Sequence, residues 1–422
     1  MERYNEYNPT NIEWLPQIPK HWHLETLRKF LRMVSIKNHP EKPLLSVTRE
    51  NGVIIRDTES KEENHNFIPE DLSGYKYVEI GDFCINKMKS WQGSYGVSDY
   101  EGIVSPAYYI CKLSGVDGKF FSKAIRSKCY VSFFAQYSKG IRIDQWDLSP
   151  ISLKSIPFFL PPKEEQQAIV SYLDTKCSRI ETLLSNKEKE ISLLQEMKQR
   201  IIADAVTHGL NPNVKLKSTN IPWLPEIPEH WEIKPIRSLL REATDKSETG
   251  EEELLSLSQY TGISYKKEAK NVGMFEAEST VGYKKVKAGQ FVMNIMLAWN
   301  GSYAVSSLDG IISPAYCVFA FISDCDKMYY HYLLRLGIYS GAFKTASRGI
   351  IDSRLRLYPN RFYPFPIICP PIEEQHAIVS YITERTSKIN SLIEKLNKEI
   401  ECIKEYKQRL ISDVVTGQIK IS

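Results

Sequence analysis

The chain has 422 residues, of which 42% are hydrophobic and 25% charged, so it is typical of globular proteins and too long for one ordinary domain. Its formal net charge is +4 and its isoelectric point about 8.4, which permits a polyanionic partner but does not require one. The eight cysteines are scattered without a CxxC pair, which favours reduced structural thiols over a zinc site or a disulfide framework.

The N-terminal residues show no basic start followed by an apolar stretch, and no apolar run is long enough to cross a bilayer. We therefore expect no signal peptide and no membrane span. The predicted location is the cytoplasm.

The strongest signal in the chain is an internal repeat. The segment WLPQIPKHW at Trp14–Trp22 recurs as WLPEIPEHW at Trp223–Trp231, an offset of 223 − 14 = 209 residues. The same offset relates two further pairs of blocks, Pro161–Tyr172 with Pro370–Tyr381 and Lys198–Arg200 with Lys407–Arg409. Three blocks with one offset indicate a tandem duplication with halves of nearly equal length.

The first part of each half mixes aromatic and β-branched residues with glycine-containing turns, as in residues 81–85 (GDFCI) and 289–292 (GQFV). This texture predicts mainly β-strands, with helical patches such as Lys327–Leu336. Each half therefore begins with an α/β domain of about 150 residues.

The last part of each half has the pattern of a long helix. Two prolines at 161 and 162 are followed by Glu164 and Glu165, residues that favour a helix N-terminus. Apolar residues then recur every three or four positions, and the second half repeats the pattern, which predicts coiled-coil helices of about 45 residues, roughly 65 Å each. Lysines that interrupt this seam either fix the register of the two helices or contact a partner; they are Lys187, Lys198 and Lys407.

The order domain, helix, domain, helix predicts an α+β fold in which two similar α/β domains are separated by two long antiparallel coiled-coil helices, with a pseudo-two-fold internal repeat. The predicted boundaries are 1–160 for the first domain, 161–208 for the first helix, 209–369 for a linker and the second domain, 370–418 for the second helix, and 419–422 for a tail.

Two motifs, each present in both halves, resemble those of the specificity subunits of type I restriction–modification systems. One is the WLPxIPxHW segment before each domain. The other is the LPPxxEQxxI entry into each long helix, at Leu160–Ile169 and again from Cys369, where cysteine replaces leucine. The resemblance covers essentially the whole chain, and the paired occurrence is more specific than either motif alone.

The resemblance implies a non-catalytic subunit of a DNA methyltransferase/endonuclease complex. The two domains would be target recognition domains, each reading one half of a bipartite, interrupted site in double-stranded DNA. The helices would set the spacer and dock two methyltransferase subunits, and motor-nuclease subunits would join the complex. S-adenosylmethionine, ATP and Mg²⁺ are expected on those partner subunits, and no cofactor is expected on this chain.

Two other classes are possible. A fused recognition and methyltransferase enzyme would need a glycine-rich cofactor loop and an Asn/Asp-Pro-Pro-aromatic motif to hold a flipped adenine, but the nearest string, Asn211-Pro212-Asn213, is typical of a turn. The sequence has no phosphate-binding GxxxxGK[ST] loop and no HExxH spacing, so no catalytic residue and no metal ligand is predicted. A coiled-coil scaffold would explain the helices but not the duplicated domains.

Base-reading residues are expected where the two copies diverge inside matched segments, because the two half-sites usually differ. Residues 44–52 (LLSVTRENG) match 254–262 (LLSLSQYTG) at their ends and differ at the centre. Arginine suits the guanine edge and glutamine the adenine edge; the alternative is an unconstrained solvent loop. With a second divergent segment at 86–92 and 294–300, the candidates are Thr48, Arg49, Asn51, Lys87, Lys89, Gln92, Ser258, Gln259, Tyr260 and Asn300.

The remaining candidates recur in or near matched segments. Cations beside glycine turns are candidate phosphate contacts or ordinary solvated charges: Lys139, Arg142, Lys344, Arg348 and Arg354. The first helical turns carry candidate partner-docking residues, for which capping is the alternative: Glu165, Gln166, Glu374 and Gln375. Aromatic residues that either stack on DNA or, more commonly, lie in the core are Trp91, Tyr95, Trp299 and Tyr303. Tryptophans expected to tie each domain to a helix end are Trp14, Trp22, Trp223 and Trp231.

Overall fold

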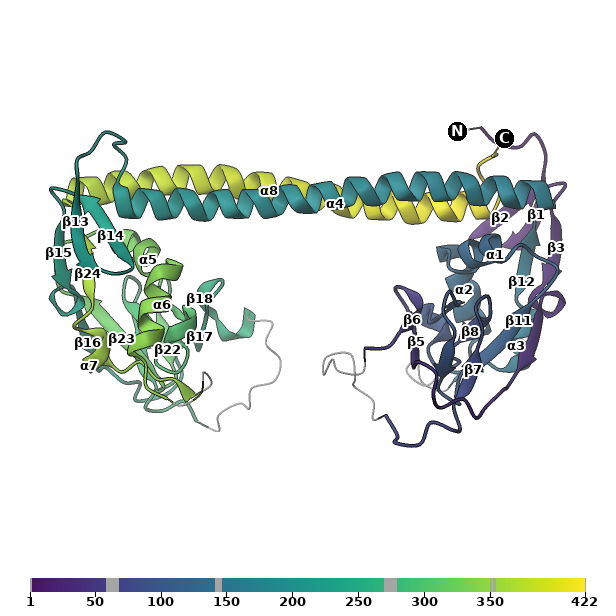
Figure 1. Ribbon diagram of the computed structural model, residues 1–422, viewed down its shortest axis with the longest axis horizontal. Helices are drawn as coiled ribbons and strands as arrows, with labels where there is room; N and C mark the ends of the chain where they lie inside the picture. Colours follow the sequence, from purple (N-terminus) through teal and green to yellow (C-terminus); the bar gives the residue numbers. More distant parts are fainter. Residues whose placement is uncertain are drawn as a thin grey trace. The chain divides into compact units, whose positions relative to one another are not determined.

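The computed structural model describes residues 2–57, 68–140, 146–268, 279–349, 351 and 354–421. The chain divides into two compact units, unit 1 (Met1–Glu188 with Asn397–Ser422) and unit 2 (Lys189–Leu396). The long helices α4 (Lys163–His208) and α8 (Ile372–Val415) each contribute residues to both units (Figure 1). Each unit therefore holds one globular domain and a segment of each long helix.

The domain of unit 1 is built on a four-stranded antiparallel sheet in the order β4 (Leu31–Val34), β11 (Tyr109–Leu113), β8 (Phe83–Ile85) and β9 (Tyr95–Val97). Four two-stranded antiparallel pairs surround it: β1 (Tyr7–Ile12) with β2 (Leu15–Pro19), β3 (His23–Thr26) with β12 (Pro157–Leu160), β5 (Leu45–Thr48) with β6 (Gly52–Ile55), and β7 (Lys76–Val78) with β10 (Gly102–Val104). The shorter helices are η1 (Leu27–Lys29), η2 (Ser90–Gln92), α1 (Gly118–Ile125), α2 (Lys128–Tyr137) and α3 (Pro150–Ser155).

The domain of unit 2 repeats this arrangement. Its sheet has the order β16 (Leu240–Ala243), β23 (Tyr316–Phe321), β20 (Phe291–Asn294) and β21 (Tyr303–Val305). Its two-stranded pairs are β13 (Leu216–Ile221) with β14 (Leu224–Pro228), β15 (Glu232–Pro235) with β24 (Pro366–Cys369), β17 (Leu255–Ser258) with β18 (Gly262–Tyr265), and β19 (Lys284–Val286) with β22 (Gly310–Ile312). Its shorter helices are η4 (Ile236–Ser238), η5 (Lys266–Glu268), η6 (Ala298–Asn300), α5 (Lys327–Leu334), α6 (Gly337–Ala346) and α7 (Pro359–Phe362).

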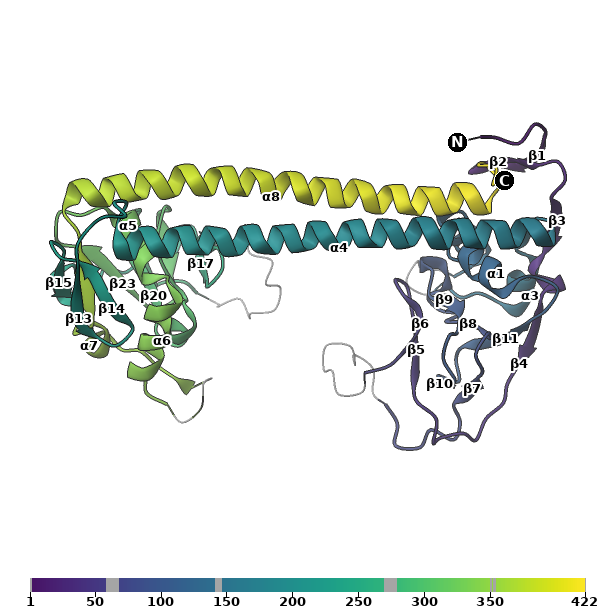
Figure 2. The same cartoon turned by 45° about the horizontal axis from the view of Figure 1, so that its top comes forward.

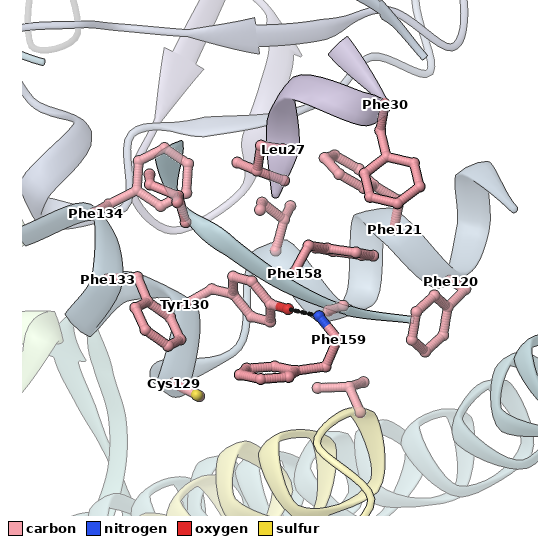
Figure 3. Packing of buried hydrophobic residues seen from close by; sticks show 14 of the residues in the cluster. Leu27, Phe30, Phe120, Phe121, Cys129, Tyr130, Phe133, Phe134, Phe158 and Phe159 are labelled. Atoms are coloured by element: carbon pink, nitrogen blue, oxygen red, sulfur yellow. Dashed lines mark hydrogen bonds between the residues drawn. The ribbon is translucent and has the colours of Figure 1, made fainter. Parts of the chain in front are cut away.

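The core of unit 1 is rich in aromatic rings, as Figure 3 shows. Phe158 of β12 is fully buried, with its ring 5.2 Å from that of Phe30 and 5.5 Å from that of Tyr130, centroid to centroid. The Tyr130 hydroxyl accepts a hydrogen bond from the backbone N–H of Phe159 (3.1 Å), which satisfies a polar group inside an apolar cluster. In unit 2 the matching strand β24 carries two isoleucines instead, Ile367 and Ile368.

Within each unit, the segments of α4 and α8 pair in antiparallel fashion. In unit 1 Lys407 of α8 lies 2.7 Å from Glu181 of α4, and Lys187 pairs with Glu399; the partner's number falls as the α4 number rises, so the two segments run in opposite directions. In unit 2 Lys198 donates to Asn390 Oδ1 (2.8 Å). The three lysines that interrupt the apolar seam therefore bind the opposite helix, as the register interpretation predicts.

The prediction of an α+β fold with two similar α/β domains and two long antiparallel helices is confirmed by these elements. The helical patch expected at Lys327–Leu336 corresponds to α5. In the described part of the chain, the search for a helix with the length and apolarity of a membrane span finds none.

Candidate nucleic-acid interface

The first divergent segment forms the hairpin of β5 and β6. Thr48 pairs with Gly52 and leaves a three-residue tip, Arg49, Glu50 and Asn51. Gly52 has a φ of +70°, the left-handed conformation that closes such turns and that glycine adopts without strain. The Thr48 hydroxyl accepts from the Asn51 N–H and donates to the Gly52 carbonyl, both at 3.1 Å. The tip thus satisfies part of its own backbone, while the side chains of Arg49 and Glu50 are 67% and 74% exposed.

The matching segment forms the hairpin of β17 and β18 with the same strand pairing. Ser258 pairs with Gly262, whose φ is +77°, and the Ser258 hydroxyl accepts from the Tyr260 N–H (3.1 Å). Tyr260 is 83% exposed and Gln259 half-buried. An aromatic ring and an amide, both chemically able to contact a base, therefore lie on one tip.

Two arginines hold these tips, and they were missed in the sequence. Arg126 donates from Nη2 to the carbonyls of Arg49 (3.0 Å) and Glu50 (2.7 Å), and from Nη1 to that of Tyr95 (2.7 Å). Arg335 makes the same set of bonds to the carbonyls of Gln259 (2.6 Å), Tyr260 (3.4 Å) and Tyr303 (2.8 Å). The two arginines lie 209 residues apart, the offset of the repeat, and that recurrence is the signal that could have found them.

The second divergent segment surrounds η2 and η6. Lys87 donates to Asp147 Oδ2 (3.2 Å) and is half-buried, Lys89 is exposed, and Gln92 is half-buried. In unit 2 Asn300 Oδ1 accepts from the Ser302 hydroxyl (2.8 Å). Of these candidates, Lys89 is the most accessible.

The aromatic residues of this segment separate into two groups. Tyr95 and Tyr303 are fully buried, so the core interpretation is confirmed for them. Trp91 packs edge-on against Trp146 (5.5 Å between ring centroids). The ammonium of Lys344 lies 5.2 Å from the ring centroid of Trp299, an arrangement that stabilises a cation on an aromatic face.

The candidate phosphate contacts lie beside the second divergent segment. Lys139 and Asp147 exchange two backbone hydrogen bonds (3.0 Å each), and Leu148 N–H donates to the Lys87 carbonyl (3.1 Å). In unit 2 the matching exchange joins Arg348 and Arg356 (3.0 and 2.9 Å). The candidates Lys139, Lys344, Arg348 and Arg354 are exposed, and Arg142 lies outside the described residues. The structure therefore brings the second divergent segment and the candidate phosphate contacts together in each domain.

The hairpins approach the same region through β9 and β21. β5 and β6 lie beside β9 in unit 1 (Figure 2). An ideal Cβ on Gly96 of β9 would lie 3.2 Å from Gly52 Cα, and one on Gly262 would lie 3.5 Å from the Cβ of Ala304 in β21. Because η2 directly precedes β9 in the chain, the hairpin and the second segment belong to one part of the domain.

The glutamate–glutamine pairs make bonds within the chain. Glu165 Oε2 lies 3.1 Å from Trp22 Nε1 and 2.9 Å from His21 Nε2, and Glu374 accepts from Trp231 Nε1 (2.9 Å) and lies 2.6 Å from His230 Nε2. Trp22 and Trp231 therefore tie their domains to a helix start, as predicted.

The glutamines of these pairs are 4% exposed. Gln166 accepts from the Asp117 N–H (2.9 Å) and donates to the Pro161 carbonyl (2.9 Å). Gln375 makes the same pair of bonds with Asp326 and Pro370 (2.9 and 2.8 Å). These contacts give the glutamate–glutamine pairs a structural role at each helix start. Their role in docking partner subunits stays a prediction.

The described residues contain no group of three or more His, Cys, Asp or Glu side chains that could hold a metal ion.

Comparison with known proteins gives a consistent result, although no family model matches the chain. It is 22% identical over 462 aligned residues to the putative type I restriction enzyme MjaX specificity subunit of Methanocaldococcus jannaschii, covering 100% of this chain and 99% of the relative. It is 27% identical over 308 residues to the MjaVIII specificity subunit of the same organism, covering 69% and 68%. Its fold matches a solved chain described under "Structural basis underlying complex assembly and conformational transition of the type I R-M system", with a TM-score of 0.66, 13% identity, and coverage of 95% and 99%.

Both sequence relatives are named as specificity subunits, and the prediction of a non-catalytic subunit is confirmed by that likeness. The chain is similar over its whole length to a protein named as a type I specificity subunit, and its fold is similar to that of a chain from a type I restriction–modification system.

Proposed function

We propose that the chain is the DNA-sequence-recognition subunit of a type I restriction–modification complex, in which each domain reads one half of a bipartite, interrupted site. The observation that carries this proposal is the pair of hairpin tips. They have one backbone arrangement and one arginine support, yet they differ in the exposed side chains that they present. Two readers of different half-sites would need this combination.

The chemistry of the exposed side chains suits the two parts of DNA recognition. Arginine can donate two hydrogen bonds to the O6 and N7 of guanine, and glutamine can bond the N6 and N7 of adenine; Arg49 and Gln259 are assigned these parts. Cations that contact phosphates orient a protein on DNA without reading its sequence. We assign these phosphate contacts to the exposed Lys139, Arg348 and Arg354, together with Lys344 and Arg142.

The long helices are assigned the spacer and the docking of two methyltransferase subunits. The polar contacts Lys407–Glu181, Lys187–Glu399 and Lys198–Asn390 support this assignment, because such contacts fix the register of a helix pair and a fixed register keeps the gap between half-sites constant. Motor-nuclease subunits complete the assembly in the cytoplasm. S-adenosylmethionine belongs to the methyltransferase subunits, and ATP and Mg²⁺ to the motor subunits.

The net charge of +4 agrees with a subunit that binds DNA as part of a complex. Non-specific affinity for DNA depends on the number of phosphates that cations neutralise. We therefore expect the isolated chain to bind DNA weakly and the assembled complex to bind it tightly.

The test is to co-express the chain with its methyltransferase subunits and to map methylated adenines across a host genome. The expected result is one bipartite motif with a gap of constant length. The matched control is the same methyltransferase subunits without this chain, which should leave no specific methylation. A continuous motif, or methylation that does not depend on the chain, would contradict the proposal.

A further inference from the structure

We propose that Arg126 and Arg335 are positioning residues that determine, each for its own half-site, which bases the hairpin tip can read. This inference rests on the proposed function, because it concerns the same tips. Neither arginine is itself a base reader: their guanidinium groups bind backbone carbonyls of their own domain.

The arginine side chain joins the hairpin tip to a helix end and to a strand of the sheet. Arg126 is the C-terminal cap residue of α1, and Arg335 has the same place after α5. From that helix end, Nη1 bonds the carbonyl of the first residue of β9 or β21, and Nη2 bonds two consecutive carbonyls of the tip. The planar guanidinium therefore fixes the tip backbone relative to both a helix end and a sheet strand.

The environment of the guanidinium favours this part. Burial lowers the pKa of both Arg126 and Arg335, yet arginine stays protonated at any physiological pH. Each guanidinium donates to three backbone carbonyls, and the dipoles of these carbonyls compensate its charge. Removal of the side chain would leave these carbonyls without their donor and release the tip.

The glycine that closes each turn, directly next to the tip, is already held by close packing. Gly52 lies against the backbone of Gly96, and Gly262 against Ala304. The tip, by contrast, has exposed side chains and is held by its own turn and by the arginine. Readers such as Arg49 and Tyr260 can discriminate bases only if the backbone that carries them is rigid, because loss of orientation removes base contacts that depend on geometry.

Lysine cannot replace this arginine well. Its ammonium is a compact charge that lacks the planar fork of the guanidinium, so it can bond the tip or the strand but not both in fixed geometry. Arg126→Lys and Arg335→Lys are therefore expected to keep the fold and the charge and to lose the positioning. Lys123 of α1 provides a matched control, since it pairs with Asp174 (2.6 Å) and not with the hairpin.

The experiment uses the full chain in complex with its methyltransferase subunits and a library of random-sequence DNA duplexes as the probe. Bound duplexes are sequenced for the wild type, Arg126→Lys, Arg335→Lys and Lys123→Ala. We expect each arginine variant to lower base discrimination about tenfold at positions in one half-site, a different half for each variant. Lys123→Ala should select the same site as the wild type.

Hydrogen exchange is a second measurement, which distinguishes local loosening of the tip from a general loss of structure. Hydrogen exchange in Arg126→Lys should accelerate at the tip amides of residues 49–51 and stay unchanged in the core of the domain and throughout unit 2. Unchanged base preferences, relaxation of both half-sites together, or uniformly weaker binding with unchanged preferences would overturn the inference while leaving the proposed function intact. A wild-type complex that selects no bipartite site would instead overturn the proposed function itself.

Discussion

The domains of the two units hold their hairpin tips with the same bonds but differ in the charges around the candidate interface. Arg126 and Arg335 bond matching carbonyls. At the backbone exchange beside the second segment, however, unit 1 pairs Lys139 with Asp147 whereas unit 2 pairs Arg348 with Arg356. One domain thus places an acidic residue where the other places a cation.

This difference separates two kinds of residue within a single chain. Side chains that bond backbone or fill the core recur at matching positions of the two copies, as do Tyr95 and Tyr303, or Gln166 and Gln375. Side chains that face solvent on the tips do not. A duplicated protein therefore carries its own internal control: the shared residues build the fold, and the divergent exposed residues are free to specify ligands.

The largest expected effect is the loss of the tryptophan that ties each domain to a helix start. Trp22→Ala and Trp231→Ala should each cost about 3 to 5 kcal/mol of unfolding free energy, because a large buried ring and a hydrogen bond are lost together. Hydrogen exchange should place the loss of protection in unit 1 for Trp22→Ala and in unit 2 for Trp231→Ala. The control Trp14→Ala, at a more exposed ring, should cost less. Equal loss in both units from either variant would contradict the assignment of each tryptophan to its own domain.

The second prediction concerns acidification, which we expect to destabilise unit 2 through a histidine that unit 1 lacks. Burial lowers the pKa of His331 to about 4, and its Nδ1 accepts the Val305 N–H (3.2 Å); the residue at this place in unit 1 is Ser122. Because the unfolded histidine binds a proton near pH 6.5 and the folded one near pH 4, stability is full above about 6.5 and falls as the pH drops toward 4. We expect a loss of about 2 to 3 kcal/mol in unit 2.

The measurement for this effect is unfolding by denaturant at about pH 7.5 and about pH 4.5, with His331→Ser as the comparison. The variant should be less stable at the higher pH but should lose less on acidification than the wild type. If acid destabilises both chains by the same amount, His331 does not account for the sensitivity of unit 2.

The third effect compares the two glutamates at the helix starts. Glu165 is 14% exposed and also accepts from the Tyr4 hydroxyl, whereas Glu374 is 39% exposed. Burial and the nearby Glu165 raise the pKa of Tyr4. Glu165→Gln should therefore cost about 1 to 2 kcal/mol and Glu374→Gln about 0.5 to 1 kcal/mol. Thermal unfolding of the two variants measures the order, and a larger loss from Glu374→Gln would reverse the comparison.

The smallest effect concerns the helix pair. Lys407 bonds Glu181 in unit 1, and the repeat places Lys198 with Asn390 in unit 2. Glu181→Asn should make the first contact like the second and cost at most about 1 kcal/mol at low salt. Near 1 M NaCl the cost should shrink, because salt screens an exposed ion pair. A cost that does not depend on salt would show that the pair acts through packing instead.

The elements that carry local sequence signals could be predicted from the sequence. The start of α4 follows directly from the two prolines and the acidic first turn, and α5 from its local pattern. The pairing of strands could not be predicted, because β4 and β11 lie far apart in the chain and their patterns carry no register. The same limit applies to side-chain contacts between residues that are distant in sequence. Trp22 bonds Glu165, 143 residues away, and Arg126 bonds two tip residues that lie 76 and 77 residues away.

Divergence between the copies pointed to the hairpin tips, and the structure places those residues at the exposed turn of each hairpin. It could not reveal which candidates are already engaged. Lys87, for example, bonds Asp147, a residue outside its own segment, whereas Lys89 two residues later is exposed.

The most direct test of the account is to transfer one tip onto the other domain. Arg49→Gln, Glu50→Tyr and Asn51→Thr together give the hairpin of unit 1 the tip of unit 2, while the supporting Arg126 remains. In the complex with methyltransferase subunits, the methylated motif should change in one half-site, at base pairs under the tip, and keep its other half and its gap. A motif that stays the same, or that changes in both halves, would contradict the claim that each domain reads its own half-site through its hairpin tip.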